Sequence, residues 1–75
     1  MPDVFRTLPE WLDHLGWSQR DLARHAHVNP HTVGRAYDGD GVTPHSAQKI
    51  AKAISEASHS EVLVGHIRGL VIHRV

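Results

Sequence analysis

The stretch that decides the fold is residues 18–37, SQRDLARHAHVNPHTVGRAY. Ser18 stands three residues before Asp21, so its hydroxyl can accept a hydrogen bond from that residue's backbone N–H and begin a helix. Asn29 followed directly by Pro30 gives a second start signal, because asparagine is a favoured cap and proline suits the first helical position. The two helices predicted from these signals span about 19–25 and 30–38. Three to four residues therefore separate them.

Two further helices are predicted on either side of this pair. Thr7 and Glu10 have the spacing of a capping box, and Gly16 follows at a place where a helix can end in a left-handed residue. Thr43-Pro44 begins the last helix, which fades within residues 55–60. Apolar residues at helical spacing form the predicted core: Leu8, Trp11, Leu12, Leu15, Trp17, Leu22, Ala23, Ala26, Val33, Ala36, Tyr37, Ala47, Ile50, Ala51 and Ile54.

After residue 60 the apolar pattern changes to that of extended chain. Two triplets rich in β-branched residues, 62–64 and 70–72, predict two short strands or one interrupted strand. Because an isolated hairpin is marginal in water, this tail is expected to pack on the helices or to pair with the tail of a second chain. The predicted fold class is mostly α, with four helices over residues 1–60 and a short C-terminal β extension over 61–75.

Composition narrows the possible classes of function. Seventy-five residues, 40% hydrophobic and 21% charged, predict one small globular domain. The chain has no cysteine, which excludes disulfides and thiolate zinc sites. It has no phosphate-binding glycine loop, HExxH motif or nucleophile elbow, so we do not expect an enzyme. Without a signal peptide or an apolar run of about 18 residues, the expected protein is cytoplasmic and has no membrane segment.

Eight histidines raise the question of a metal site. His25, His27 and His31 lie close together in the sequence, and imidazole binds zinc, copper and nickel. However, His27 and His31 stand on either side of a predicted turn, so their spacing does not place them on one continuous helix. No acidic or thiol ligand stands beside them. The sequence therefore predicts no metal and no other cofactor.

Two short helices joined by a tight turn can leave the second helix prominent enough to enter a DNA major groove. Residues 18–24, SQRDLAR, and 28–33, VNPHTV, resemble the helix-turn-helix of the Cro/phage-repressor (Xre-like) family. The resemblance extends from Leu8 to about Ile54. One departure is His27, where the family usually has glycine; histidine is among the residues that tolerate positive φ.

The resemblance implies a four-helix, repressor-like domain over residues 1–60 that binds duplex DNA sequence-specifically. It implies a transcriptional regulator, a repressor, acting as a homodimer with the helix over 30–38 in the major groove. Gln19 would then bond a phosphate, and Arg35 would read a guanine through O6 and N7. The implied DNA-contacting residues are Gln19, Asn29, Pro30, His31, Thr32, Gly34, Arg35, Thr43 and His45.

Two of these residues have a second interpretation. Asn29 also caps a predicted helix, and Gly34 fits a close approach to DNA and a tight helix crossing equally well. The charge of the chain is balanced, with eight Lys+Arg and eight Asp+Glu. Residues 18–37 carry Arg20, Arg24 and Arg35 against Asp21 alone. This local excess predicts few phosphate contacts per subunit and a modest dependence of affinity on salt.

The predicted dimer interface is the tail. As in a Cro-like protein, its strands would pair across a two-fold axis through four apolar residues: Val62, Val64, Leu70 and Ile72. A monomer with an intramolecular hairpin is the alternative. A second class of function is also open, namely a small adaptor or antitoxin-like protein whose helix-turn-helix or apolar tail contacts a partner protein.

Overall fold

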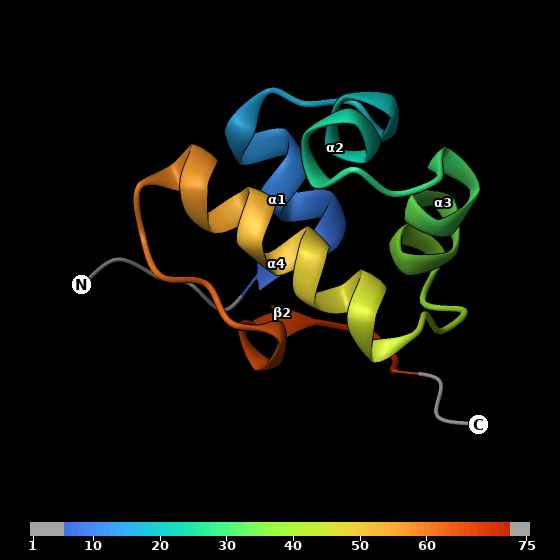
Figure 1. Ribbon diagram of the computed structural model, residues 1–75. Helices are drawn as coiled ribbons and strands as arrows, with labels where there is room; N and C mark the ends of the chain where they lie inside the picture. Colours follow the sequence, from blue (N-terminus) through green and yellow to red (C-terminus); the bar gives the residue numbers. More distant parts are fainter. Residues whose placement is uncertain (1–5, 73–75) are drawn as a thin grey trace.

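The computed structural model describes residues 6–72, which form four α-helices and two short strands (Figure 1). The elements are β1 (Arg6–Thr7), α1 (Leu8–Leu15), α2 (Gln19–Ala26), α3 (Pro30–Asp38), α4 (Pro44–Ser58), a 3-10 turn η1 (Val64–His66) and β2 (Ile67–Arg68). The predicted fold class, mostly α with four helices and a short C-terminal β extension, is confirmed. Helix α4 crosses the middle of the molecule, with α2 on one side and β2 on the other (Figure 1).

Each helix begins at the side-chain cap that its sequence predicts. The Thr7 hydroxyl accepts from the Glu10 N–H at 3.3 Å, while the Glu10 carboxylate accepts from the Thr7 N–H at 3.0 Å. The Thr43 hydroxyl accepts from the Ser46 N–H at 3.2 Å. Helix α1 ends at Gly16, whose φ of 71° lies in the left-handed region that favours glycine. These local interactions explain why the helix bounds were predictable.

One apolar core joins the four helices. Its largest fully buried side chains are Leu8, Leu22, Val33, Ile50 and Ile54. Trp11 is also buried, as predicted, and the Arg6 guanidinium lies 5.2 Å from the centre of its ring. The core therefore draws on every helix, and it holds α2 against both α3 and α4.

Three predicted core residues, Leu15, Trp17 and Tyr37, lie nearer the surface. Tyr37 is 36% exposed, because α3 packs through Val33 and Ala36 and the next residue points about 100° away from Ala36. Trp17 is only half-buried, since it belongs to the link between α1 and α2 rather than to a helix. Its ring stacks on His25 with ring centres 4.3 Å apart and planes 2° apart.

The strands of the tail lie elsewhere than predicted. Residues Val64–His66 form the 3-10 turn, and β2 pairs in parallel with β1, with Arg6 opposite Ile67. Ile72 forms an isolated parallel bridge with Val42. Within residues 6–72 no hairpin joins 62–64 to 70–72, so that predicted alternative is wrong. The partner of β2 is a two-residue strand at the other end of the chain, too short to show a periodic pattern.

The tail is also anchored to α4 by one serine. The Ser55 hydroxyl accepts from the Val62 N–H at 2.8 Å and lies 2.8 Å from both the Val62 and the Ala51 carbonyl oxygens. Val62 itself is buried in the core. The Ser55 hydroxyl thus supplies the hydrogen bonds to the Val62 N–H and C=O groups that a neighbouring strand would otherwise supply.

Ser55→Ala is expected to lower the free energy of unfolding by about 1–3 kcal/mol, because it leaves the Val62 backbone groups without their partner. Urea unfolding followed by circular dichroism measures the change. Ser58→Ala is the matched control, since the Ser58 hydroxyl makes only a local bond of 3.4 Å to the Ser55 carbonyl. Equal effects of the two variants would show that Ser55 does not anchor the tail.

Candidate nucleic-acid interface

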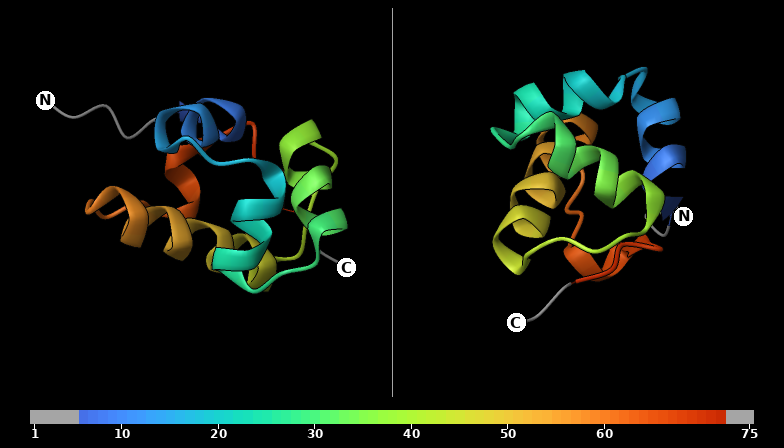
Figure 2. Two further views of the ribbon diagram at one scale, coloured as in Figure 1. Left: turned by 90° about the horizontal axis from the view of Figure 1, so that it is seen from above. Right: turned by 90° about the vertical axis from the view of Figure 1, so that its right-hand side faces the viewer.

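Helices α2 and α3 are joined by three residues, His27-Val28-Asn29. His27 closes α2 in the left-handed conformation, with φ 57° and ψ 43°, so the histidine is at the positive φ that its place in the turn requires. The Val28 N–H then donates to the Ala23 carbonyl at 3.1 Å. This tight reversal places α3 across one side of the molecule, with α2 next to it and the start of α4 close by (Figure 2, right).

Helix α3 divides into a buried side and an open side. Val33 and Ala36 are buried in the core. His31 and Arg35, four residues apart, are both exposed, and Thr32 is half-buried. The exposed side of α3 is therefore polar, and it carries Asp38 as well as His31 and Arg35. The apolar side of the helix is buried in the core.

Gln19, at the start of α2, lies beside Gly34 on α3. A methyl group added to Gly34 would find Gln19 Oε1 as its nearest neighbour, at 3.5 Å, which is an ordinary van der Waals distance. The crossing of the two helices therefore has room for a methyl group at this position. Tight packing between α2 and α3 does not explain why residue 34 is glycine. The geometry instead joins Gln19 and the middle of α3 into one continuous surface.

Two of the residues predicted to touch DNA act as helix caps. Asn29 Oδ1 accepts from the His31 N–H at 2.8 Å. The Thr43 hydroxyl accepts from the Ser46 N–H and donates to the Ser46 hydroxyl at 3.0 Å. Pro30 and His45 are exposed near these caps. Of the predicted polar residues, the exposed ones that do not act as caps are Gln19, His31, Arg35 and His45, and Thr32 is half-buried.

The start of α2, which carries Gln19, is held by a reciprocal cap. The Asp21 N–H donates to the Ser18 hydroxyl at 3.1 Å, and the Ser18 N–H donates to the Asp21 carboxylate at 2.9 Å. These bonds favour the ionised carboxylate and hold the pKa of Asp21 below its ordinary value of 3.8. The cap's contribution to stability is therefore present above about pH 4 and is lost as the pH falls through that lowered pKa.

The four residues predicted to form a dimer interface face their own chain. Val62 is buried, and Val64, Leu70 and Ile72 are half-buried against the same core. Pairing a second chain through Val62 would require its removal from the core and from Ser55. The exposed apolar residues of the tail are instead Leu63 and Val71.

Lys49 and Lys52 on α4 were not among the site residues predicted from the sequence. With His45 they have the spacing i, i+4, i+7, which places all three on one side of the helix. That spacing was the available signal. The spacing alone did not indicate a site, because the sequence does not show that the end of α2 lies opposite this side of α4.

Comparison of the chain with protein-family models, with curated proteins and with solved structures gave no match. Within residues 6–72, no helix is both long enough and apolar enough to cross a membrane. The same part of the chain holds no group of three or more His, Asp or Glu residues that could bind a metal ion. A function is therefore inferred from the surface formed by α2, α3 and the start of α4.

His27→Gly is expected to raise the free energy of unfolding by about 1 kcal/mol, because glycine adopts the left-handed conformation without strain. His59→Gly is a matched control, since His59 closes α4 with φ 56° and ψ 30°. Both gains can be measured by urea unfolding. A loss of stability in His27→Gly alone would mean that contacts of the imidazole outweigh the backbone strain.

Proposed function

We propose that this chain is a cytoplasmic transcriptional regulator that binds duplex DNA sequence-specifically, with α3 in the major groove. The supporting observation is the open side of α3, where His31 and Arg35 are exposed. An exposed helix whose apolar side is already buried can approach the base edges without disturbing the fold. Its length of 9 residues is enough to place several side chains along a groove.

Arg35 is the proposed base reader. It lies in the last turn of α3, and its guanidinium can donate two hydrogen bonds to O6 and N7 of one guanine. His31, one turn earlier, can donate to a base edge or a phosphate. The glycine between them, Gly34, leaves room for the DNA to approach the helix backbone closely.

Gln19 is the proposed phosphate contact beside the groove. It is the first residue of α2, where free backbone N–H groups and the helix dipole favour an anion. Its side-chain oxygen lies next to Gly34, so the same phosphate would flank the groove that α3 occupies. His45, exposed at the start of α4, would meet the backbone nearby.

A repressor that reads a palindrome would act as a homodimer, with half-sites about 34 Å apart. The residues of the tail that remain available for such an interface are Leu63, 53% exposed, and Val71, 48% exposed. Exposed apolar side chains can take part in a protein interface when they belong to a larger apolar surface. They are equally available to the second candidate function, an adaptor or antitoxin-like protein whose tail binds a different protein.

Selection of bound duplexes from a random DNA pool tests the proposed function. We expect one enriched palindrome that is recovered at low and at near-physiological salt. Arg35→Ala should then weaken binding by about 1–3 kcal/mol and relax the preference at one base pair of each half-site. Arg24→Ala, which removes an exposed arginine of α2, is the control and should leave the preference unchanged. No enrichment with the unchanged protein would refute sequence-specific binding.

The Leu63→Ser/Val71→Ser double variant tests the tail as the dimer interface. We expect it to shift the sedimentation equilibrium from dimer to monomer while the helical content stays the same. Deletion of residues 61–75 is a poorer test, because it would also remove Val62 and Ile67 from the core. A double variant that remains fully dimeric would place the interface on another surface.

A further inference from the structure

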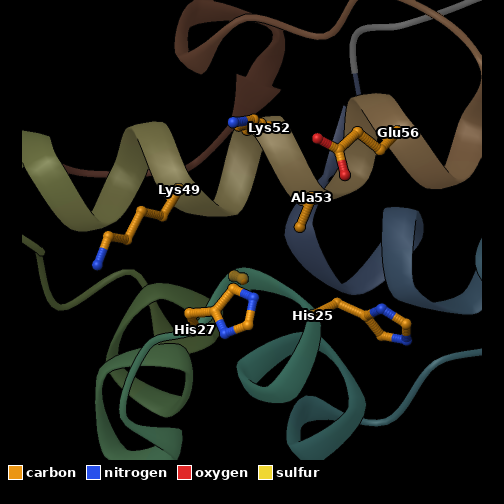
Figure 3. Close-up of a pocket in the computed structure, with 7 residues that line it drawn as sticks. His25, His27, Lys49, Lys52, Ala53 and Glu56 are labelled. Carbon is orange, nitrogen blue, oxygen red and sulfur yellow. The ribbon is translucent and has the colours of Figure 1, made fainter.

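A hollow of about 280 Å³ lies between the end of α2 and the middle of α4 (Figure 3). Its floor includes Ala26 and Ala53, which are buried and leave space above them. His27 approaches it from the turn after α2, and Lys49 and Lys52 line it from α4, whereas the ring of His25 points away and stacks on Trp17 (Figure 3). Two lysines and one histidine thus border the hollow, and Glu56 is the one carboxylate in its lining.

The two lysines of this hollow, Lys49 and Lys52, are the only lysines among the 75 residues. They stand three residues apart on α4, where neighbouring like charges on a helix repel each other. Neither forms an ion pair with any residue from 6 to 72. Both lie in the middle of α4, so neither is placed to offset the negative end of that helix's dipole. Glu56, four residues after Lys52, offsets part of the repulsion between the two lysines. An anion in the hollow would offset the rest.

His27 adds an independent indication. A residue with a side chain is strained in the left-handed conformation that His27 adopts, and glycine would relieve that strain. The imidazole of His27 extends into the space between α2 and α4 (Figure 3). The turn therefore has a strained residue, His27, in a place that glycine would fill without strain, and the imidazole of this residue lines the hollow.

We propose that this basic hollow binds a phosphate group. A phosphate offers several oxygen acceptors to donors that converge from two helices, whereas two lysines would repel a metal cation. The small alanine floor leaves room for a compact anion above it. The phosphate belongs either to a small phosphorylated compound or to the DNA backbone beyond the groove that α3 would occupy.

The position of the hollow makes both sources possible. Lys49 follows His45 by one turn of α4, and its side chain extends toward the α2–α3 side of the molecule (Figure 3). A DNA strand that met His45 could therefore continue to Lys49. Only this DNA source rests on the function proposed above, because a small phosphorylated compound could bind the hollow without DNA.

The first test is a titration of the full chain with inorganic phosphate and with pyrophosphate at constant ionic strength, followed by amide NMR shifts. We expect saturable shifts at Ala26, His27 and Ala53. Lys49→Gln and Lys52→Gln should each raise the Kd about three- to tenfold, the range between an exposed ion pair and a charged hydrogen bond. His27→Gly should also raise the Kd, although it is expected to stabilise the fold.

Two variants control for overall charge. Arg68→Gln removes one positive charge from β2, which α4 separates from α2 (Figure 1), and it should leave the Kd unchanged. Glu56→Gln removes the one carboxylate from the lining of the hollow and should lower the Kd. Shifts that do not saturate, or equal effects of Lys52→Gln and Arg68→Gln, would overturn the proposal.

The DNA arm repeats the lysine variants with a bound duplex over a range of salt concentrations. If the phosphate comes from DNA, each variant should weaken binding and reduce the salt slope by about 0.9 for each phosphate that it no longer neutralises. Unchanged DNA binding together with saturable phosphate binding would assign the hollow to a small phosphorylated compound. Failure of the unchanged protein to bind any duplex would refute the function proposed above but not the phosphate site.

Discussion

The three-residue turn between α2 and α3 is the constraint on which the rest of the structure depends. His27 reverses the backbone in the left-handed region, and only this reversal brings Val33 and Ala36 of α3 onto the core. The opposite side of α3 is then exposed, with His31 and Arg35 on it. The same packing holds α2 against α4, so the turn determines both the open side of α3 and the basic hollow.

The chain has no net charge, yet its basic residues are not evenly spread. Arg35 lies on the open side of α3 with His31 and Asp38, whereas both lysines lie on α4. These two types of cation suit different tasks, because a planar guanidinium can make paired bonds to one base and an ammonium acts as a point charge. In the function and the site that we propose, Arg35 would therefore read a base and the two lysines would hold a phosphate.

The tail completes the core instead of standing apart from it. Val62 and Ile67 are buried, β2 pairs with β1, and Ile72 bridges to Val42. Long-range contacts of this kind join the two ends of the described chain across the helices. As a result, the apolar triplets of the tail are mostly used within one chain, and only Leu63 and Val71 are left for a partner.

The sequence by itself determined the four helices, their caps, the histidine in the turn and the exposure of Arg35, since each depends on residues within a few positions of one another. Only the tertiary structure decided the partner of β2, the burial of Val62 and the exposure of Tyr37. It also decided that Lys49, Lys52 and His27 line one hollow. Those features depend on which surfaces meet when the whole chain folds. A strand of two residues, or the spacing of two lysines on one helix, does not indicate which element will lie opposite it.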